Sequence, residues 1–401
     1  MQHAQSRAGL RRWTGRGSLV ALAGLAVFGV SPALPALAAS WSSPVTLPGS
    51  CGSSVAVNQA GAMAAGGTFT PSGGTLQVDV CTSTNGTTWQ ATDLGAGGGI
   101  VVAVTPAGQT VALWESTGST ALEAAVHPAG GSWGAPVTLS TSVSGGLVLG
   151  TDGSGNVIAG WIGSGVDVTD AVLPAGSSSW GPATTLSTAN DQGVAHDLSM
   201  AVNSGGGAII MFNGGLNNLW AISGTVTGGF SAPVEVASGA GSPTYVRIGT
   251  SAVALNNAGE ASVVWSVLDG QTGLLTRSPS GTWGDTIVST RTAPAVPVSA
   301  AIDGAGNAIA VFGSSYSWHL AGGSWQTAAA LPSGSSGGLA VADPAGTFVY
   351  ANTSGDAFTF SAGATSFGTG SGSLGSLGGL KIVPGHAVML ASDAISTEPV
   401  S

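Results

Sequence analysis

Polar turns and short apolar runs alternate along the whole chain in one recurring order. In residues 152–161 the turn Asp-Gly-Ser-Gly-Asn is followed by an apolar run that ends on Trp161. The same order recurs at residues 104–114, 202–212, 255–265 and 302–312, with weaker copies at 57–67 and 341–351 and a shortened one at 382–390. This self-similarity predicts a protein assembled from one structural unit used many times.

A second motif lies between successive copies of the first. It begins with an aromatic residue and continues through proline, as in residues 41–47, 133–139, 180–186 and 230–236. More divergent copies begin at Trp89, Trp283, Trp325 and Phe367. The turn glycines of the first motif are spaced 39 to 53 residues apart, and the two motifs alternate without exception. One unit is therefore about 45 residues long.

Each unit is predicted to contain four short strands. The apolar run after the turn is apolar on consecutive residues, as in residues 157–161 and 308–312, which indicates a strand covered on both faces. A variable third strand follows, and the aromatic-proline motif supplies the fourth. No segment carries an apolar stripe with a period of 3.6 residues, so we expect almost no helix.

This pattern predicts an all-β fold, a β-propeller of about eight four-stranded blades, with seven blades as the alternative. A β-helix would need a shorter repeat, and an immunoglobulin-like array would need longer modules. The N-terminal strand at residues 41–47 has no unit of its own, and the last unit lacks a good third strand beyond residues 394–400. We expect the N-terminal strand to pair with the C-terminal unit and close the ring.

The N-terminus has the features of a signal peptide over residues 1–39, followed by a single propeller domain over residues 40–401. Four arginines precede an apolar segment at residues 18–30, and Ala-Leu-Ala at 36–38 supplies small residues for cleavage. We expect a secreted, extracellular protein; Arg11 and Arg12 leave general and twin-arginine export both open. No later segment reaches about 18 apolar residues, so no membrane span is expected.

Charge limits the possible partners. After removal of residues 1–39, only Arg247, Arg277, Arg291 and Lys381 remain as basic residues against 18 acidic ones. A chain this acidic has no electrostatic attraction for nucleic acid or for an anionic membrane. We expect a monomer with no nucleic-acid partner.

The chain has two cysteines, Cys51 and Cys81. In an exported protein they are expected to form one disulfide, which would staple the first repeat and contribute about 3–4 kcal/mol.

Residues 82–89, Thr-Ser-Thr-Asn-Gly-Thr-Thr-Trp, resemble the Asp-box repeat of sialidase-like (BNR) propellers, with Thr84 where that family has Asp. The resemblance implies a propeller, because Asp boxes are structural turns in that family. An active sialidase would also need three converging arginines and a paired tyrosine nucleophile. The mature arginines Arg247, Arg277 and Arg291 instead fall in two adjacent units. We therefore expect no catalytic residues and no cofactor.

A calcium-loop interpretation of Asp152, Ser154 and Asn156 fails further along the loop. Val157 stands where glycine is required, and Gly163 stands where the bidentate glutamate should be. These residues, and the matching turn at Asp303, are predicted to cap turns. The histidines have no metal-ligand spacing, so we expect no metal site.

Candidate ligand-binding residues lie outside the repeat pattern. Nine of the eleven tryptophans after residue 39 occupy repeat positions, where they are expected to separate blades. Trp220 and Trp318 do not, and Trp318 lies in a cluster with Tyr316 and His319 that suits sugar rings or a protein surface. The alternative is a locally packed outer strand. The predicted function is a binding module for a polysaccharide or a cell-surface protein; a sialidase-like hydrolase is the alternative, and a structural surface protein comes third.

Overall fold

In a computed structural model the chain divides into two units, Met1–Leu37 and Ala38–Ser401. The structure describes residues 41–401 except 119, 189–192, 216–217, 239–247, 268–271, 290–295, 333–336, 362–363, 365, 369, 371–375, 384–385, 392–393 and 400–401. The predicted signal peptide, residues 1–39, lies outside the described residues. Within the described part, no helix is long and apolar enough to span a bilayer.

The described part of the second unit is built from antiparallel β-sheets and contains no α-helix, which confirms the all-β prediction. Within the sheets, most strands that are consecutive in sequence are hydrogen-bonded neighbours. Grouped by repeat, the strands are β2 (Ser54–Val57), β3 (Met63–Phe69), β4 (Gln77–Ser83) and β5 (Gln90–Val104); β6 (Thr110–Ser116), β7 (Leu122–His127) and β8 (Val137–Ser140); β9 (Val143–Thr151), β10 (Val157–Gly163), β11 (Val168–Leu173) and β12 (Thr184–Thr185); β13 (Ala195–Val202), β14 (Gly207–Gly214), β15 (Asn218–Thr225), β16 (Gly229–Phe230) and β17 (Val234–Ser238); β18 (Ile248–Leu255), β19 (Ala261–Val267), β20 (Thr272–Arg277) and β21 (Trp283–Ser289); β22 (Val298–Ile302), β23 (Ala308–Phe312), β24 (Ser315–His319) and β25 (Ala329–Ala330); β26 (Leu339–Ala342), β27 (Thr347–Ala351) and β28 (Ala357–Ser361); and β29 (Leu377–Val383), β30 (His386–Ala391), β31 (Ala394–Pro399) and β1 (Val45–Thr46).

Several repeats depart from the predicted four separate strands. β5 is 15 residues long; residues 90–96 pair with β4, and residues 97–104 pair with β6. The register shifts beyond Gly98, and Gly99 has a φ of 63°, a conformation that glycine adopts without steric cost. The first two repeats therefore share one strand. The sheet β26–β28 has three strands among the described residues.

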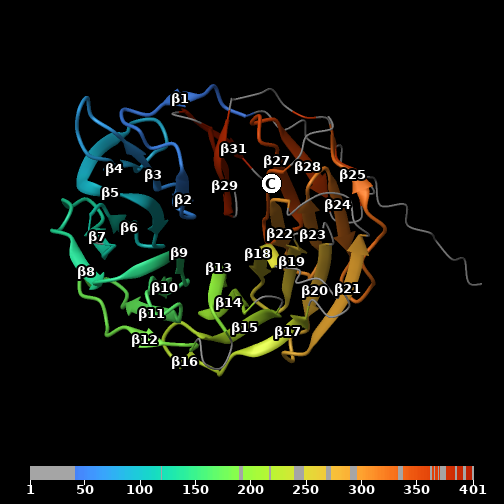
Figure 1. The fold of residues 1–401 in the computed structure, drawn as a ribbon. Helices are drawn as coiled ribbons and strands as arrows, with labels where there is room; N and C mark the ends of the chain where they lie inside the picture. The colour runs from blue at the N-terminus through green and yellow to red at the C-terminus, as the bar shows by residue number, and fades with distance from the viewer. Residues whose placement is uncertain are drawn as a thin grey trace, which may run out of the picture. The chain divides into compact units, whose positions relative to one another are not determined.

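The sheets lie around a common centre, with strands such as β2, β9, β13, β18 and β29 on the inner side (Figure 1). Each inner strand contacts the next: β2 contacts β5, β5 contacts β9, and the series continues through β13, β18, β22, β26 and β29. β29 contacts β2 in turn. At the chain ends, β1 pairs with β31, with Val45 opposite Ile395.

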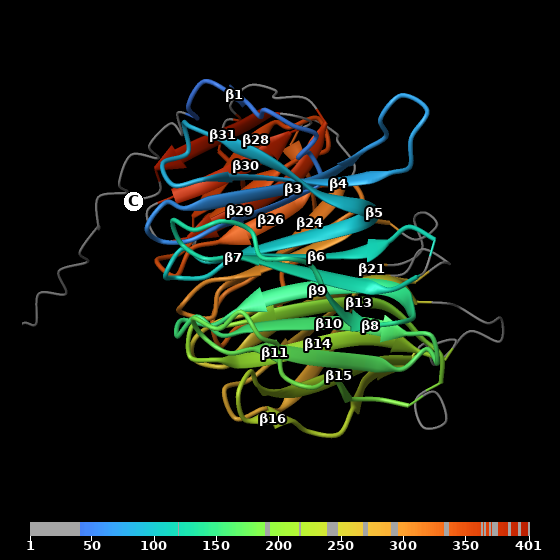
Figure 2. The same cartoon turned by 90° about the vertical axis from the view of Figure 1, so that its left-hand side faces the viewer.

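The core consists of layers between neighbouring sheets. Every residue of β10 is buried except Gly163, as its continuous apolar sequence predicts. Neighbouring sheets such as β9–β12 and β13–β17 pack face to face (Figures 1 and 2). A Cβ atom on Gly150 would lie 2.5 Å from Cγ2 of Val202, so the small residues allow the sheets to approach closely.

The turns after the inner strands are held by side-chain caps. The Asp152 carboxylate accepts hydrogen bonds from the backbone N–H groups of Ser154 (2.9 Å) and Asn156 (2.8 Å) and from Asn156 Nδ2 (2.8 Å). Asp303 has the same arrangement with Ala305 and Asn307. The predicted turn-capping role of both aspartates is confirmed. Within the described residues, no group of three or more His, Cys, Asp or Glu could hold a metal ion.

Some of these caps also link neighbouring sheets. Asn203 Nδ2 donates to the carbonyl of Asn256 at 2.8 Å, and Asn256 Nδ2 donates to the carbonyl of Asp303 at 3.1 Å. The Asp-box-like turn is capped differently. There Asn85 Oδ1 accepts from the N–H groups of Thr87 (2.9 Å) and Thr88 (2.8 Å). Asn85, rather than Thr84, therefore holds that turn.

Cys51 and Cys81 form the predicted disulfide, with a Cα–Cα distance of 6.0 Å and both residues fully buried. Replacing both cysteines with alanine is expected to lower the free energy of unfolding by about 3–4 kcal/mol, because the bond limits the unfolded chain across 30 residues. Urea unfolding of the variant and of the reduced wild type measures the loss. A change below about 1 kcal/mol in both would contradict this estimate.

Candidate functional site

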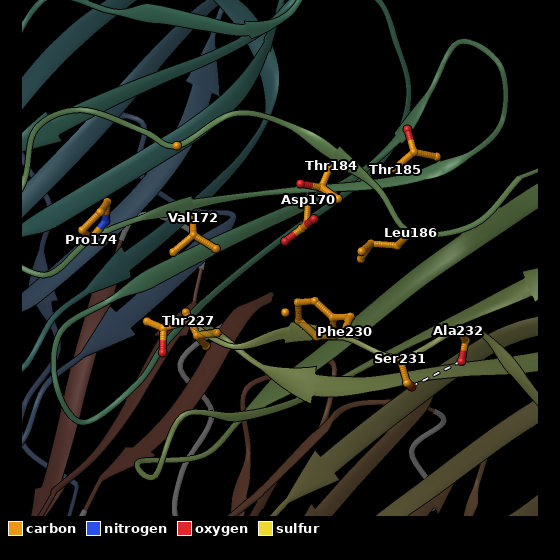
Figure 3. A pocket seen from close by; sticks show the side chains of 13 residues that line it. Asp170, Val172, Pro174, Thr184, Thr185, Leu186, Thr227, Phe230, Ser231 and Ala232 are labelled. Carbon is orange, nitrogen blue, oxygen red and sulfur yellow. Dashed lines mark hydrogen bonds between the residues drawn. The ribbon is translucent and has the colours of Figure 1, made fainter.

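A cleft of about 720 Å³ opens between the sheet β9–β12 and the neighbouring sheet β13–β17 (Figure 3). One wall comes from β11 and β12, with Asp170, Thr184 and Thr185. The facing wall comes from the connection between β15 and β16 and from β16 itself, with Thr227 and Phe230. This volume lies within the range of pockets that bind small molecules.

The strand pairing of β11 sets the position of Asp170. Asp170 lies opposite Gly160 of β10 on one side and opposite Thr184 of β12 on the other. β12 is only two residues long, so the outer edge of this sheet is short. The cleft lies along this edge, between β11 and the next sheet.

The floor of the cleft is apolar. Val172, Leu186 and Phe230 pack against the hydrophobic cluster that joins the two sheets. Val226, on the facing wall, belongs to the same cluster and is 2% exposed. Asp170 is therefore a carboxyl group beside a largely apolar surface.

Asp170 is the unusual residue of this cleft. It is 6% exposed, and within the described structure its Oδ1 atom is buried and has no hydrogen-bond partner. Burial raises the pKa of this carboxyl to about 6, partly opposed by a hydrogen bond from its own backbone N–H. A buried acceptor without a donor is energetically costly. The Asp170 carboxyl group thus gives the cleft a hydrogen-bond acceptor for a ligand that carries a donor.

The other polar groups of the cleft are hydroxyls. Thr184, Thr185 and Thr227 are exposed to solvent, and the ring of Phe230 is half-buried on the wall facing Asp170 (Figure 3). Threonine hydroxyls both donate and accept hydrogen bonds, and an aromatic ring offers a flat apolar face. The set suits a compact ligand that carries several hydroxyls and one apolar face.

Of the four predicted ligand residues, the structure places Tyr316, Trp318 and His319 on β24 and Trp220 in another sheet. Tyr316 is 3% exposed, and its ring lies 5.7 Å from Trp318 and 4.8 Å from Phe367. Burial also raises the pKa of Tyr316. We therefore assign Tyr316 to the core, because the rings of Phe360 and Phe367 pack against it. Trp318 is half-buried at the edge of the same cluster.

Trp220 lies on β15, in a different sheet from Tyr316 and Trp318 on β24. It is half-buried and stacks on Phe212 at 6.4 Å, so it too packs locally. His319 is the exception among the four residues. It is partly exposed and lines a second groove, between β20–β21 and β22–β24, together with Arg277 and Trp283.

Asp170 was not among the residues predicted to bind a ligand. The available signal is a single carboxyl within the otherwise largely apolar strand Val168–Leu173. Its burial depends on the neighbouring sheet, which the local sequence does not show.

No family model matches this chain, and no curated protein matches it. Similar solved structures include the BP39L lectin from Burkholderia pseudomallei, with a TM-score of 0.54 and 15% identity over 81% of this chain and 99% of the other. BamB from Moraxella catarrhalis has a TM-score of 0.57 and 12% identity over 90% and 100%. Sqt1 from Saccharomyces cerevisiae has a TM-score of 0.60 and 10% identity over 90% and 99%. At these identities the likeness shows the fold alone, a β-propeller, as the repeats predict.

Proposed function

We propose that this chain is a secreted saccharide-binding propeller with its ligand site in the cleft at Asp170. The observation that carries the proposal is the Asp170 carboxyl group, which lines a cleft walled by threonine hydroxyls and Phe230 and has no hydrogen-bond partner at its Oδ1 atom. A sugar ring brings hydroxyl donors for the carboxylate and an apolar C–H face for the aromatic ring. A hydrocarbon ligand would leave the carboxyl unpaired.

We also infer that the propeller is a closed ring of eight blades, in which β1 closes the ring by pairing with β31. The cycle of contacts among eight inner strands and the pairing of Val45 with Ile395 support this count over seven blades. Export is supported by the predicted signal peptide and agrees with a buried disulfide, a bond that persists in oxidising compartments.

A binding role is favoured over the sialidase-like hydrolase and over a purely structural role. Glycoside hydrolysis normally needs two carboxyl groups flanking the bond that breaks. Among the described residues that line the cleft, Asp170 is the only carboxyl group. Of the three mature arginines, Arg277 lies far along the chain from Asp170, and Arg247 and Arg291 lie outside the described residues. A structural role alone would leave the cost of burying Asp170 unexplained.

The test is binding of residues 40–401 to a panel of neutral and acidic saccharides. Phe230→Ala is expected to weaken the best neutral ligand about 3- to 10-fold, because the aromatic face that packs on the sugar is lost. Val234→Ala is the matched control, since this exposed side chain lies on β17 and is not among the residues lining the cleft. Absence of any binding across the panel would refute the proposal, and equal losses in both variants would refute the site.

A further inference from the structure

The second groove differs from the first in its charge. It has a volume of about 470 Å³ and lies between β20–β21 on one side and β22–β24 on the other. Arg277 and Trp283 line it from the first sheet, and His319 lines it from the second. Among the described residues, Arg277 is the single arginine, in a chain whose acidic residues outnumber its basic ones.

Arg277 is held in place but is not neutralised. Its Nη1 atom donates to the carbonyl of Gly259 at 2.8 Å, and its guanidinium carbon lies 6.0 Å from the centre of the Trp283 ring. Arg277 and Trp283 are direct cross-strand neighbours of β20 and β21. No described carboxylate pairs with Arg277, and its buried Nε donor has no acceptor. The guanidinium is therefore positioned and charged, with donor capacity left over.

The rest of the groove adds polar groups. His319 Nε2 lies 3.0 Å from the carbonyl of Gly323, so this nitrogen donates a hydrogen bond to that carbonyl. Glu260 also lines the groove, and its Oε2 atom accepts a hydrogen bond from Asn256 Nδ2 at 2.8 Å. One cation and one anion thus share the groove with an aromatic ring.

The repeat supplies an internal comparison. A third groove lies between β4 and β7, which belong to the first two repeats. His127 of β7 lines this groove, as His319 of β24 lines the second groove. Each histidine ends its strand and lies close to a tryptophan, at 5.2 Å from Trp133 and at 5.4 Å from Trp325. β4 lines the third groove as β20 lines the second, but β4 ends with Ser83 whereas β20 ends with Arg277. The cation distinguishes the second groove from its counterpart.

We propose that the groove at Arg277 binds the carboxylate of an acidic saccharide, such as a hexuronate. A guanidinium binds a planar carboxylate through two parallel hydrogen bonds, and Trp283 offers a face for the sugar ring. Glu260 would accept hydrogen bonds from ring hydroxyls. A polyanion does not fit, because Glu260 and the acidic remainder of the chain repel additional negative charges. This site is independent of the cleft at Asp170.

The experiment uses residues 40–401 carrying Asp170→Asn, so that the first cleft contributes little binding. Methyl glucuronide and methyl glucoside are titrated by calorimetry, with sulfate as a second anion. Glucuronide is expected to bind at least about 10-fold more tightly than glucoside, and Arg277→Gln is expected to weaken glucuronide about 10- to 100-fold. Arg277→Lys keeps the charge without the planar guanidinium, so its affinity for glucuronide is expected to lie between those of the Arg277 protein and the Arg277→Gln variant. His127→Ala is expected to leave this affinity unchanged.

Equal affinity for glucuronide and glucoside, or an unchanged affinity in a folded Arg277→Gln variant, would overturn the proposal. Sulfate binding as tightly as glucuronide would also overturn it, because the site would then recognise negative charge without the sugar. A negative result in this experiment does not bear on saccharide binding at Asp170 in the wild type, so the two proposals can be refuted independently.

Discussion

Replacing Asp170 with asparagine is expected to weaken saccharide binding about 10- to 100-fold at pH 7, while making the fold more stable. The loss follows from replacing a charged acceptor by a neutral amide, since hydrogen bonds to charged groups contribute about 1.5–3 kcal/mol. Calorimetry with the best neutral saccharide measures the change in affinity. Asp93→Asn is the matched control, because Asp93 is an exposed carboxylate in another sheet.

The gain in stability follows from the pKa of Asp170. This pKa is raised from 3.8 to about 6, so the folded protein holds the proton more tightly than the unfolded chain. Ionisation of Asp170 therefore lowers stability as pH rises from about 4 to about 6, with a full cost of at most about 3 kcal/mol above that window. Asp170→Asn removes the cost, so its advantage should appear at pH 7 and vanish near pH 4.

Urea unfolding of both proteins at pH 4 and pH 7 measures this difference. The affinity of the wild type for a neutral saccharide should also rise as pH increases through about 6, because the carboxylate accepts hydrogen bonds better than the carboxylic acid does. The variant should show no such rise. An Asp170→Asn protein that binds normally, or that is less stable than the wild type at pH 7, would contradict this account of the cleft.

Replacing Trp161 with alanine is expected to lower the free energy of unfolding by about 3–5 kcal/mol, the range for a buried aromatic residue. Trp161 is 1% exposed and lies in the cluster between the sheets of β6–β7 and β10–β11, with Leu122 and Ala171. Its removal leaves a cavity that the backbones of two packed sheets cannot fill. Urea unfolding provides the measurement.

Trp133→Ala is the control for Trp161→Ala. Trp133 also occupies a repeat position, but it is only half-buried at the edge of its cluster, so a smaller loss is expected. Equal losses in the two variants, or a loss below about 1 kcal/mol for Trp161, would show that the repeat tryptophans do not hold the blades apart as the packing indicates.

Much of the fold could be predicted because its determinants are local. The Asp152 cap involves residues within four positions of it, and the buried strand that follows is apolar on consecutive residues. The shared strand β5 could not be predicted in the same way. Its two halves belong to neighbouring repeats, and the change of register near Gly98 depends on pairing with both β4 and β6.

The candidate site was less predictable, because burial of a side chain depends on distant parts of the chain. Tyr316 belongs to an aromatic cluster that looks exposed in the sequence, yet Phe360 and Phe367 from the next unit cover it. Asp170 looks like an ordinary acid in the sequence, and only the structure shows that it is buried and lines a cleft between two sheets. In both cases the position of the side chain is set by parts of the chain that are distant in sequence.

The most direct test is a crystal structure of residues 40–401 with the neutral saccharide that binds best. The account predicts the sugar in the cleft between β11 and β16, with a hydroxyl within hydrogen-bond distance of the Asp170 carboxylate and the ring against Phe230. A saccharide bound elsewhere, with Asp170 still unpartnered, would contradict it.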